Sequence, residues 1–117
     1  MMARLVGFGV IEIEGQRYEQ DVVITGGVVR KRHKGPSKPY RSPYGHTPLS
    51  ADEDLPWHAA RLVIGTGANG ALPVLPQVLE EGQRRGVEVV TMRTKVACSM
   101  LADVDPSDVY AVLHVTC

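Results

Sequence analysis

Residues 61–90 have the sequence RLVIGTGANGALPVLPQVLEEGQRRGVEVV, and this stretch decides the fold class. The continuous apolar run at 61–64 is typical of a strand buried on both faces of a parallel or mixed sheet. A glycine turn follows, and the apolar residues of 73–85 then recur at helical spacing. We expect one face of this helix to carry Leu75, Val78, Leu79 and Gly82. Gly86 is expected to cap the helix, and a strand at 87–90 completes a right-handed βαβ unit.

The segments on either side of this unit supply further strands and a second helix. Residues 10–14 alternate apolar and charged side chains, and short β-branched runs at 22–24 and 28–30 flank a Gly-Gly turn. The N-terminal third therefore predicts a hairpin or meander layer. After the βαβ unit, Thr94 is expected to cap a helix that ends near Leu101, before a last strand over 109–115. We expect the inward face of that helix to carry Val96, Ala97, Met100 and Leu101.

Composition and charge limit the class of protein. The chain has 117 residues, 44% of them hydrophobic, which predicts a single α/β domain over 1–117. Thirteen basic residues balance thirteen acidic ones, so no overall field holds the chain to nucleic acid or to a membrane surface. The apolar start is too short for a signal peptide, and no run approaches membrane length. We therefore expect a cytoplasmic protein in which Cys98 and Cys117 are reduced thiols.

A long basic segment covers 30–46, with six of the thirteen basic residues and several prolines. No acidic residue lies between Asp21 and Asp52, and a loop of this length is either functional or mobile. With Tyr40 and Tyr44 among its cations, it could bind single-stranded nucleic acid, or it could be a solvated connector. Whether 34–48 is ordered stays open at this point. Ser50-Ala51-Asp52-Glu53 matches a capping box and predicts one helical turn that ends before Pro56.

The glycine turn is the first candidate for a binding site. Gly65-x-Gly67-x-x-Gly70 matches the dinucleotide fingerprint and lies between a buried strand and a helix, where backbone amides can approach an anion. However, the following strand ends in Thr91-Met92-Arg93, without the acidic residue that binds a ribose. The alternative is a strand-to-helix turn that needs glycine for its backbone conformation.

The carboxyl edge of the two strands in this unit is the second candidate, because open α/β sheets bind ligands there. Its hydroxyls, cations and helix N-termini suit a small anion. The alternative is that Thr94 is only a helix cap and that the cations are solvated. The candidate ligand-binding residues are Gly65, Thr66, Gly67, Asn69, Arg93, Thr94 and Lys95.

Candidate catalysts are scattered along the chain. His33, His46, His58 and His114 form no H-x-x-x-H or H-E-x-x-H motif and no zinc pattern with the cysteines. Cys98 lies near the inward face of a predicted helix, where cysteine usually acts as a small apolar residue. A Cys–His pair formed in space stays open. The sequence thus predicts no catalytic residue, metal ligand or cofactor.

An ordered series of short motifs resembles a known family. They are Leu62-Val63-Ile64-Gly65-Thr66-Gly67, Gly70-x-Leu72-Pro73-Val74, Arg85-Gly86-Val87-Glu88-Val89, Thr94 with Ala97-Cys98, and the ending 111–117. Together they resemble the small family that contains the adipogenesis-associated domain protein of animals, in the superfamily of mitochondrial complex I assembly factor 3. The stretch 34–44 is an addition relative to the animal members and resembles a prokaryotic subgroup.

The resemblance implies a three-layer α/β fold with a central mixed sheet of about five strands. One of these strands is antiparallel, helices pack on the sheet, and extra strands lie outside it. The family has no established activity, catalytic residues or cofactor, and its eukaryotic members have assembly or regulatory roles.

Three functions are therefore compared. The first is a non-catalytic binding or accessory protein with a protein partner, and a homo-oligomer is an open alternative. The second is a small-anion or nucleotide-binding domain, or an uncharacterised enzyme, that uses the glycine turn. The third is a nucleic-acid binder that uses residues 30–41.

Overall fold

The computed structural model describes residues 1–41 and 45–117, which build an α/β fold with a central sheet of five strands. In order across the sheet, the strands are β5 (Val28–Lys31), β4 (Val22–Thr25), β8 (Tyr110–Leu113), β6 (Arg61–Gly65) and β7 (Glu88–Met92). β6 is parallel to both β7 and β8, whereas β4 is antiparallel to both β8 and β5. Among the described strands of this sheet, β4 alone runs against the others. The mixed sheet with one antiparallel strand is therefore confirmed.

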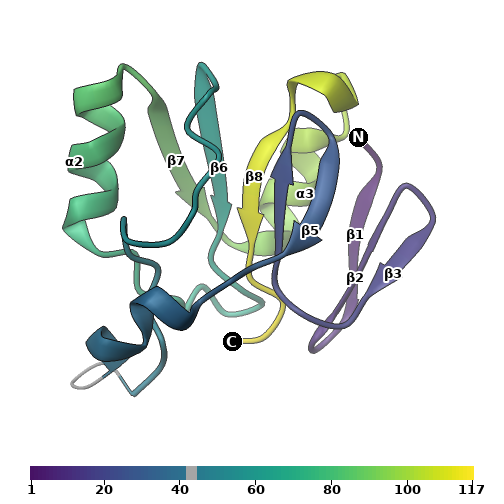
Figure 1. Ribbon diagram of the computed structural model, residues 1–117. Coiled ribbons are helices and arrows are strands. Elements are labelled where there is room, and N and C mark those ends of the chain that lie inside the picture. Colours follow the sequence, from purple (N-terminus) through teal and green to yellow (C-terminus); the bar gives the residue numbers. More distant parts are fainter. Residues whose placement is uncertain (42–44) are drawn as a thin grey trace.

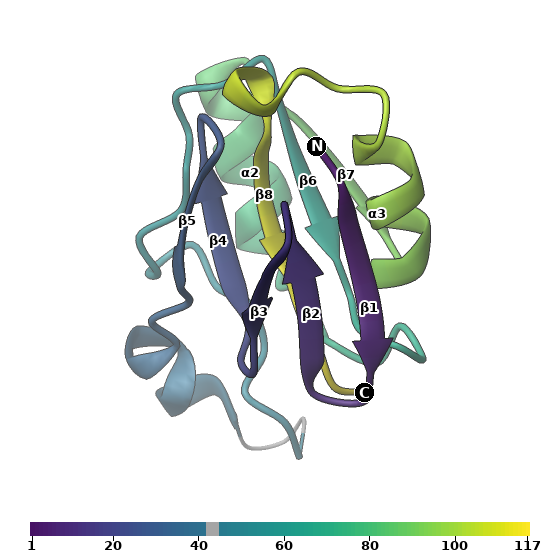
Figure 2. The same ribbon diagram turned by 90° about the vertical axis from the view of Figure 1, so that its right-hand side faces the viewer.

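A second sheet and the helices form the outer layers (Figures 1 and 2). The outer sheet consists of the antiparallel strands β1 (Ala3–Gly7), β2 (Val10–Ile13) and β3 (Gln16–Tyr18). The helical elements are α2 (Pro76–Arg85), α3 (Thr94–Leu101) and the 3-10 helices η1 (Gly35–Tyr40) and η2 (Pro106–Asp108). α2 lies on one face of the central sheet, whereas α3 and the outer sheet lie on the other. The extra layer thus comes from residues 3–18, while β4 and β5 join the central sheet.

The central sheet separates two hydrophobic cores. Along β4, Val22 and Ile24 face the outer sheet and α3, whereas Val23 faces α2. The side-chain alternation of a strand explains why one continuous apolar run serves both cores. The first core also contains Ile11 and Leu101. None of these five residues exposes more than 2% of its surface.

Two predicted helix faces need correction. α2 begins at Pro76, because Leu49 forms a β-bridge with Val74 and keeps the preceding residues extended. Leu79 is 48% exposed, since α2 covers only a narrow strip beside the edge strand β7. In α3, Val96 is 55% exposed and the buried face contains Cys98. Gly86 adopts the left-handed conformation (φ 71°) after α2, so its role as a C-terminal cap is confirmed.

The long basic segment is built into the fold in its described part. Residues 35–40 form η1, whose Ser37 is fully buried. The residues 51–53, expected to form a helical turn, make a non-helical turn instead. The reason is that the Glu53 carboxylate binds Arg32 rather than the start of a helix. Tyr44 of the predicted stacking pair lies outside the described residues. Within residues 1–41 and 45–117, no helix has the length and apolar character needed to cross a membrane.

Candidate functional site

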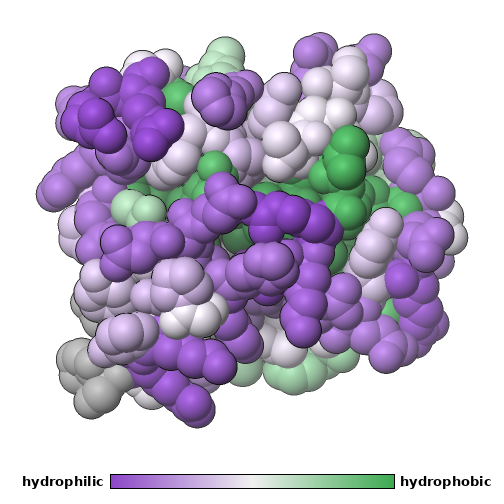
Figure 3. Space-filling model, in the orientation of Figure 1, coloured by the Kyte–Doolittle hydropathy of each residue, from purple (hydrophilic) through white to green (hydrophobic). Residues whose placement is uncertain are grey.

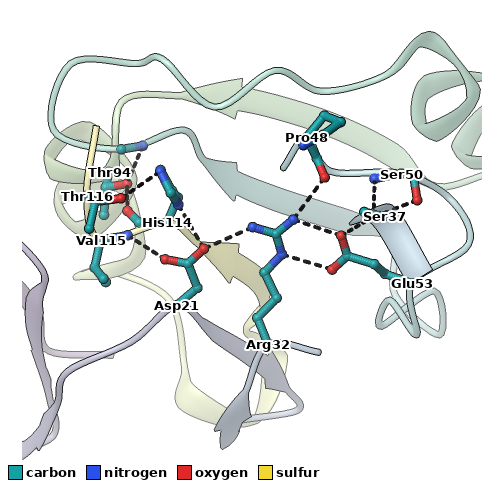
Figure 4. A network of polar contacts seen from close by, with 11 residues as sticks. Asp21, Arg32, Ser37, Pro48, Ser50, Glu53, Thr94, His114, Val115 and Thr116 are labelled. Carbon is teal, nitrogen blue, oxygen red and sulfur yellow. Dashed lines mark hydrogen bonds and ion pairs between the residues drawn. The ribbon is translucent and has the colours of Figure 1, made fainter. Parts of the chain in front are cut away.

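Three polar residues form a row directly beyond the ends of β5, β4 and β8. Val22, the first residue of β4, pairs with the last residues of β5 and β8, Lys31 and Leu113. The same two registers continue to the residue before β4 and to the residues after β5 and β8. Asp21 therefore lies opposite Arg32 on one side and opposite His114 on the other. Its carboxylate accepts hydrogen bonds from Arg32 Nη1 at 2.9 Å and from the Val115 amide at 2.9 Å, and it contacts His114 Nδ1 at 2.8 Å (Figure 4).

Arg32 joins this row to the segment between η1 and β6. Its side chain is 1% exposed and forms a bidentate pair with Glu53, Nε to Oε1 at 2.9 Å and Nη2 to Oε2 at 2.8 Å. Nη2 also donates to the Pro48 carbonyl at 3.0 Å. Ser37 donates its hydroxyl proton to Glu53, and its oxygen accepts the Ser50 amide, so η1 is fixed to the same carboxylate. One buried cation thus holds the basic segment against the end of the sheet.

The surroundings keep these groups charged. Burial alone raises the pKa of Asp21, but the hydrogen bonds from His114, the Val115 amide and Arg32 outweigh burial, so this pKa lies below its ordinary value. For Arg32, burial lowers the pKa, while the carboxylates of Glu53 and Asp21 raise it by more. Asp21 is therefore an ionised acceptor at neutral pH.

A cleft of about 310 Å³ opens beside this network. Asp21, Arg32 and His114 line it together with Lys31, Lys34 and Thr116. Thr116 Oγ1 lies 3.1 Å from His114 Nε2, so a hydroxyl, an imidazole and a carboxylate follow one another along its wall (Figure 4). This cleft is our candidate functional site.

The glycine turn has a different environment from the one expected. β6 leads to α2 on one face of the central sheet, whereas α3, on the opposite face, leads to β8. The crevice in which open α/β sheets typically bind ligands therefore lies between the ends of β6 and β8. The chain's own residues fill it: the Ala68 amide donates to Thr116, and the amides of Asn69 and Ala71 donate to the Cys117 carbonyl. A side chain at Gly67 would lie 2.8 Å from that oxygen. The expectation of free amides at this bend is wrong.

Thr94 is also not the helix cap that the sequence predicts. Arg93 occupies the capping position, and the buried Thr94 hydroxyl donates to the His114 carbonyl at 2.6 Å and accepts the Gly67 amide at 2.9 Å. It therefore joins the bend to the end of β8. A Cβ at Gly65 would lie 2.8 Å from this hydroxyl, so the close approach requires glycine.

The remaining predicted residues differ in their burial and in their hydrogen bonds. Thr66 donates its hydroxyl proton to the Met92 carbonyl at 3.0 Å, whereas Asn69, Arg93 and Lys95 are exposed. The Arg93 side chain lies against Gly70, beside the bend. Ligand binding by the seven candidate residues stays a prediction.

The residues that form the network could not be recognised as a group from the sequence. Asp21, Arg32 and His114 match no motif, and Glu53 matches only the capping box, but Asp21 and His114 each border an apolar run. The signal was the pairing of those runs: an antiparallel β4–β8 register with Val22 opposite Leu113 also places Asp21 opposite His114. In the part of the chain that the structure describes, no group of three or more His, Cys, Asp or Glu side chains is arranged to hold a metal ion.

The two cysteines differ in their surroundings. Burial raises the pKa of the Cys98 thiol, which lies inside the first core, whereas Cys117 is half-buried near the bend. Both are free thiols among the described residues. Cys98 thus has the character of a core side chain.

This architecture agrees with the family comparison. The chain belongs to a family described as "Protein of unknown function (DUF498/DUF598)", whose model matches residues 4–113. The family is the one expected from the resemblance to the complex I assembly factor superfamily.

Two solved structures resemble the chain over its whole length. The crystal structure of the conserved hypothetical protein PH1505 from Pyrococcus horikoshii OT3 is 28% identical, with a TM-score of 0.78 and full coverage of both chains, 100% each. A structure described as MT938 is 22% identical, with a TM-score of 0.53, and covers 99% of this chain and 98% of its own. The latter shows the fold alone. No protein with a curated description matches. These descriptions assign no activity.

Proposed function

We propose that the protein is a binding or accessory protein that docks an acidic partner protein on residues 31–41 of its basic segment. The observation that carries the proposal is the buried pair between Arg32 and Glu53, with Ser37 bonded to the same carboxylate. Buried ion pairs are costly to desolvate and contribute little net stability. Here the pair holds the segment in one conformation, which reduces the entropy lost when a partner binds.

The remaining cations of the segment are available for such a partner. Hydrophilic residues cover the lower left of the view in Figure 3, where η1 lies in Figure 1. Because the segment contains no acidic residue, its field is positive and attracts a carboxylate-rich surface. Its exposed basic residues are Lys31, His33, Lys34, Lys38 and Arg41. Lys31 and Lys34 also line the cleft, which has room for an acidic side chain.

A protein partner suits this surface better than nucleic acid. Single-stranded nucleic acid binds through aromatic stacking as well as charge. The Tyr40 hydroxyl donates to Asp52 at 2.6 Å, which fixes the ring beside a carboxylate.

Binding of poly-L-glutamate, measured by calorimetry at low and at high salt, tests the proposal. We expect Lys34→Glu combined with Lys38→Glu to weaken binding at least 10-fold, because both cations face the partner. Lys95→Glu is the matched control, since it reverses an exposed lysine at the start of α3 and should leave the affinity unchanged. An equal loss in both variants, or undetectable binding at low salt, would contradict the docking surface. Tighter binding to single-stranded DNA of equal charge would favour the nucleic-acid alternative.

A small-anion site at the bend is a second proposal, because Arg93 lies against Gly70 on the exposed side of the turn. It predicts that inorganic phosphate at millimolar concentration raises the melting temperature, and that Arg93→Gln removes the rise.

We also place the chain in the prokaryotic subgroup of its family and in the cytoplasm. The full-length likeness to the Pyrococcus protein supports the subgroup, and the two free thiols agree with a reducing compartment.

A further inference from the structure

The geometry of the cleft points to a covalent modification site: we propose that Thr116 accepts an acyl group from an activated ester or thioester, with His114 as its general base and Asp21 as the positioning residue. Nothing in the docking proposal requires this reaction. Both proposals involve the cleft that Lys31 and Lys34 line, but their tests substitute different residues, so the proposals can fail separately.

The hydrogen-bond order fixes which atom of His114 acts as the base. The ionised Asp21 carboxylate only accepts, so in the neutral imidazole the proton lies on Nδ1, which is 2.8 Å from Asp21. Nε2 then carries the lone pair and lies 3.1 Å from Thr116 Oγ1, which donates to it. This is the order of nucleophile, base and carboxylate that acyl-transfer enzymes use.

The orientation of the base is held firmly. Asp21 is itself held by Arg32 Nη1 and by the Val115 amide, so its carboxylate has little freedom to rotate. The His114 backbone is held at both ends, because its amide donates to Gly65 and its carbonyl accepts from Thr94. A base locked in one orientation loses little entropy in the reaction.

The Thr116 hydroxyl is not needed to hold its own segment. The Thr116 carbonyl accepts the Ala68 amide, and the preceding Val115 accepts the Gly9 amide, so main-chain bonds already fix this part of the chain. The hydroxyl faces the cleft that Lys31 and Lys34 also line. The two cations make the cleft more positive, which favours the negative charge that develops on the acyl oxygen when the hydroxyl attacks.

The reaction balances with no oxidant or reductant. Thr116 Oγ1 forms a bond to the acyl carbon while His114 Nε2 takes the hydroxyl proton. The bond from the acyl carbon to the leaving oxygen or sulfur then breaks. His114 returns the proton to the leaving group, and the products are acyl-threonine and a free alcohol or thiol.

p-Nitrophenyl acetate is the probe, with the adduct located by peptide mass spectrometry. The measurement uses a Cys117→Ala background, because the neighbouring thiol would compete. We expect one acetyl group on Thr116, formed in step with p-nitrophenol release. Thr116→Val should abolish this adduct, Thr116→Ser should retain it, and His114→Gln should slow it roughly 100-fold. Thr91→Val, an exposed position on β7, is the matched control and should leave the rate unchanged.

The tautomer gives a readout that does not depend on the reaction. Nitrogen NMR of His114 should show the proton on Nδ1, and Asp21→Asn should shift it toward Nε2 and slow acetylation together. Acetylation confined to lysines, an unchanged rate in folded His114→Gln, or a proton on Nε2 in the unsubstituted protein would overturn the proposal and leave the contact as a structural bond.

Discussion

Asp21 is the residue on which the site depends, because it joins the ends of three strands. A single carboxylate meets Arg32, His114 and the Val115 amide, partners that come from 11 to 94 residues away. Such a centre is stable only if every charge has a partner, since an unpaired buried charge is expensive. Substitutions here therefore affect folding more strongly than those of surface ion pairs.

Replacing Arg32 tests this dependence. Arg32→Met leaves the carboxylates of Glu53 and Asp21 without their cation, and we expect the free energy of unfolding to fall by about 3–5 kcal/mol in urea denaturation. The control Arg17→Ala breaks an exposed pair with Glu19 and should cost at most about 1 kcal/mol. Similar losses in the two variants would show that the buried pair is not strongly coupled. If Arg32→Met does not fold, Glu53→Gln provides a milder version.

The pH dependence of stability follows from Asp21. Its pKa is lower in the folded state than in the unfolded chain, where it is about 3.9, so folding binds fewer protons in this range. The stabilisation by Asp21 is complete above that value and is lost as the pH falls through the lower folded pKa. We expect the stability difference between the natural chain and Asp21→Asn to shrink below about pH 4. A difference that stays constant down to pH 2, roughly two units below that value, would contradict it.

Gly67 and Gly86 are each required to be glycine, but for different physical reasons. Both have positive φ, 106° and 71°, but a Cβ at Gly67 would collide with Cys117 and His114, whereas nothing lies within 4 Å of one at Gly86. We expect Gly86→Ala to cost about 1–2 kcal/mol for the backbone conformation. Gly67→Ala should cost roughly 1–3 kcal/mol more for the collision. Equal melting temperatures for the two variants would contradict the packing at the bend.

At the level of elements, the sequence predicts best where the signal is local. The strand at 61–64, its parallel partner and the Gly86 cap follow from neighbouring residues and are confirmed. The Ser50–Glu53 capping box failed because Glu53 has a stronger partner, Arg32, 21 residues away. The predicted cap at Thr94 failed for a similar reason, since its hydroxyl binds the end of β8.

The orientation of α2 can be checked with adjacent residues. Val78 is buried in the second core, whereas Leu79 is about half exposed. We expect Val78→Ala to lower the free energy of unfolding by roughly 1.5–3 kcal/mol and Leu79→Ala by less than about 1 kcal/mol. Thermal or urea unfolding measures both. A larger loss at Leu79 would restore the helix face predicted from the sequence.

At the scale of the whole molecule, the central sheet joins the two cores into one folding unit. Ile11 lies in the first core and Trp57 packs against the second, on the opposite face of the sheet. We expect Ile11→Ala to cost about 2–5 kcal/mol and to shift Trp57 fluorescence and far-UV circular dichroism to the same new midpoint. A fluorescence midpoint left at its original value would mean that the outer sheet unfolds separately. Ile11→Val provides a milder version.

The site itself could not be predicted, because it depends on strand pairing across almost the whole chain. Asp21 and His114 are 93 residues apart, and their contact exists only if β4 lies between β5 and β8 in one register. A one-residue slip would turn Asp21 toward the opposite face. The glycine bend drew attention because its pattern is contiguous, although its amides are already bonded within the chain.

The segment Val115–Cys117 occupies the crevice between β6 and β8, where a ligand would otherwise bind. An incoming anion would have to displace this segment and break three amide hydrogen bonds before it reached a free backbone N–H group. A ligand would compete with this segment, so its affinity for the backbone amides of the bend would depend on how often the segment detaches. Variants in which these three residues detach more often should therefore bind anions more tightly, although their free energy of unfolding is lower.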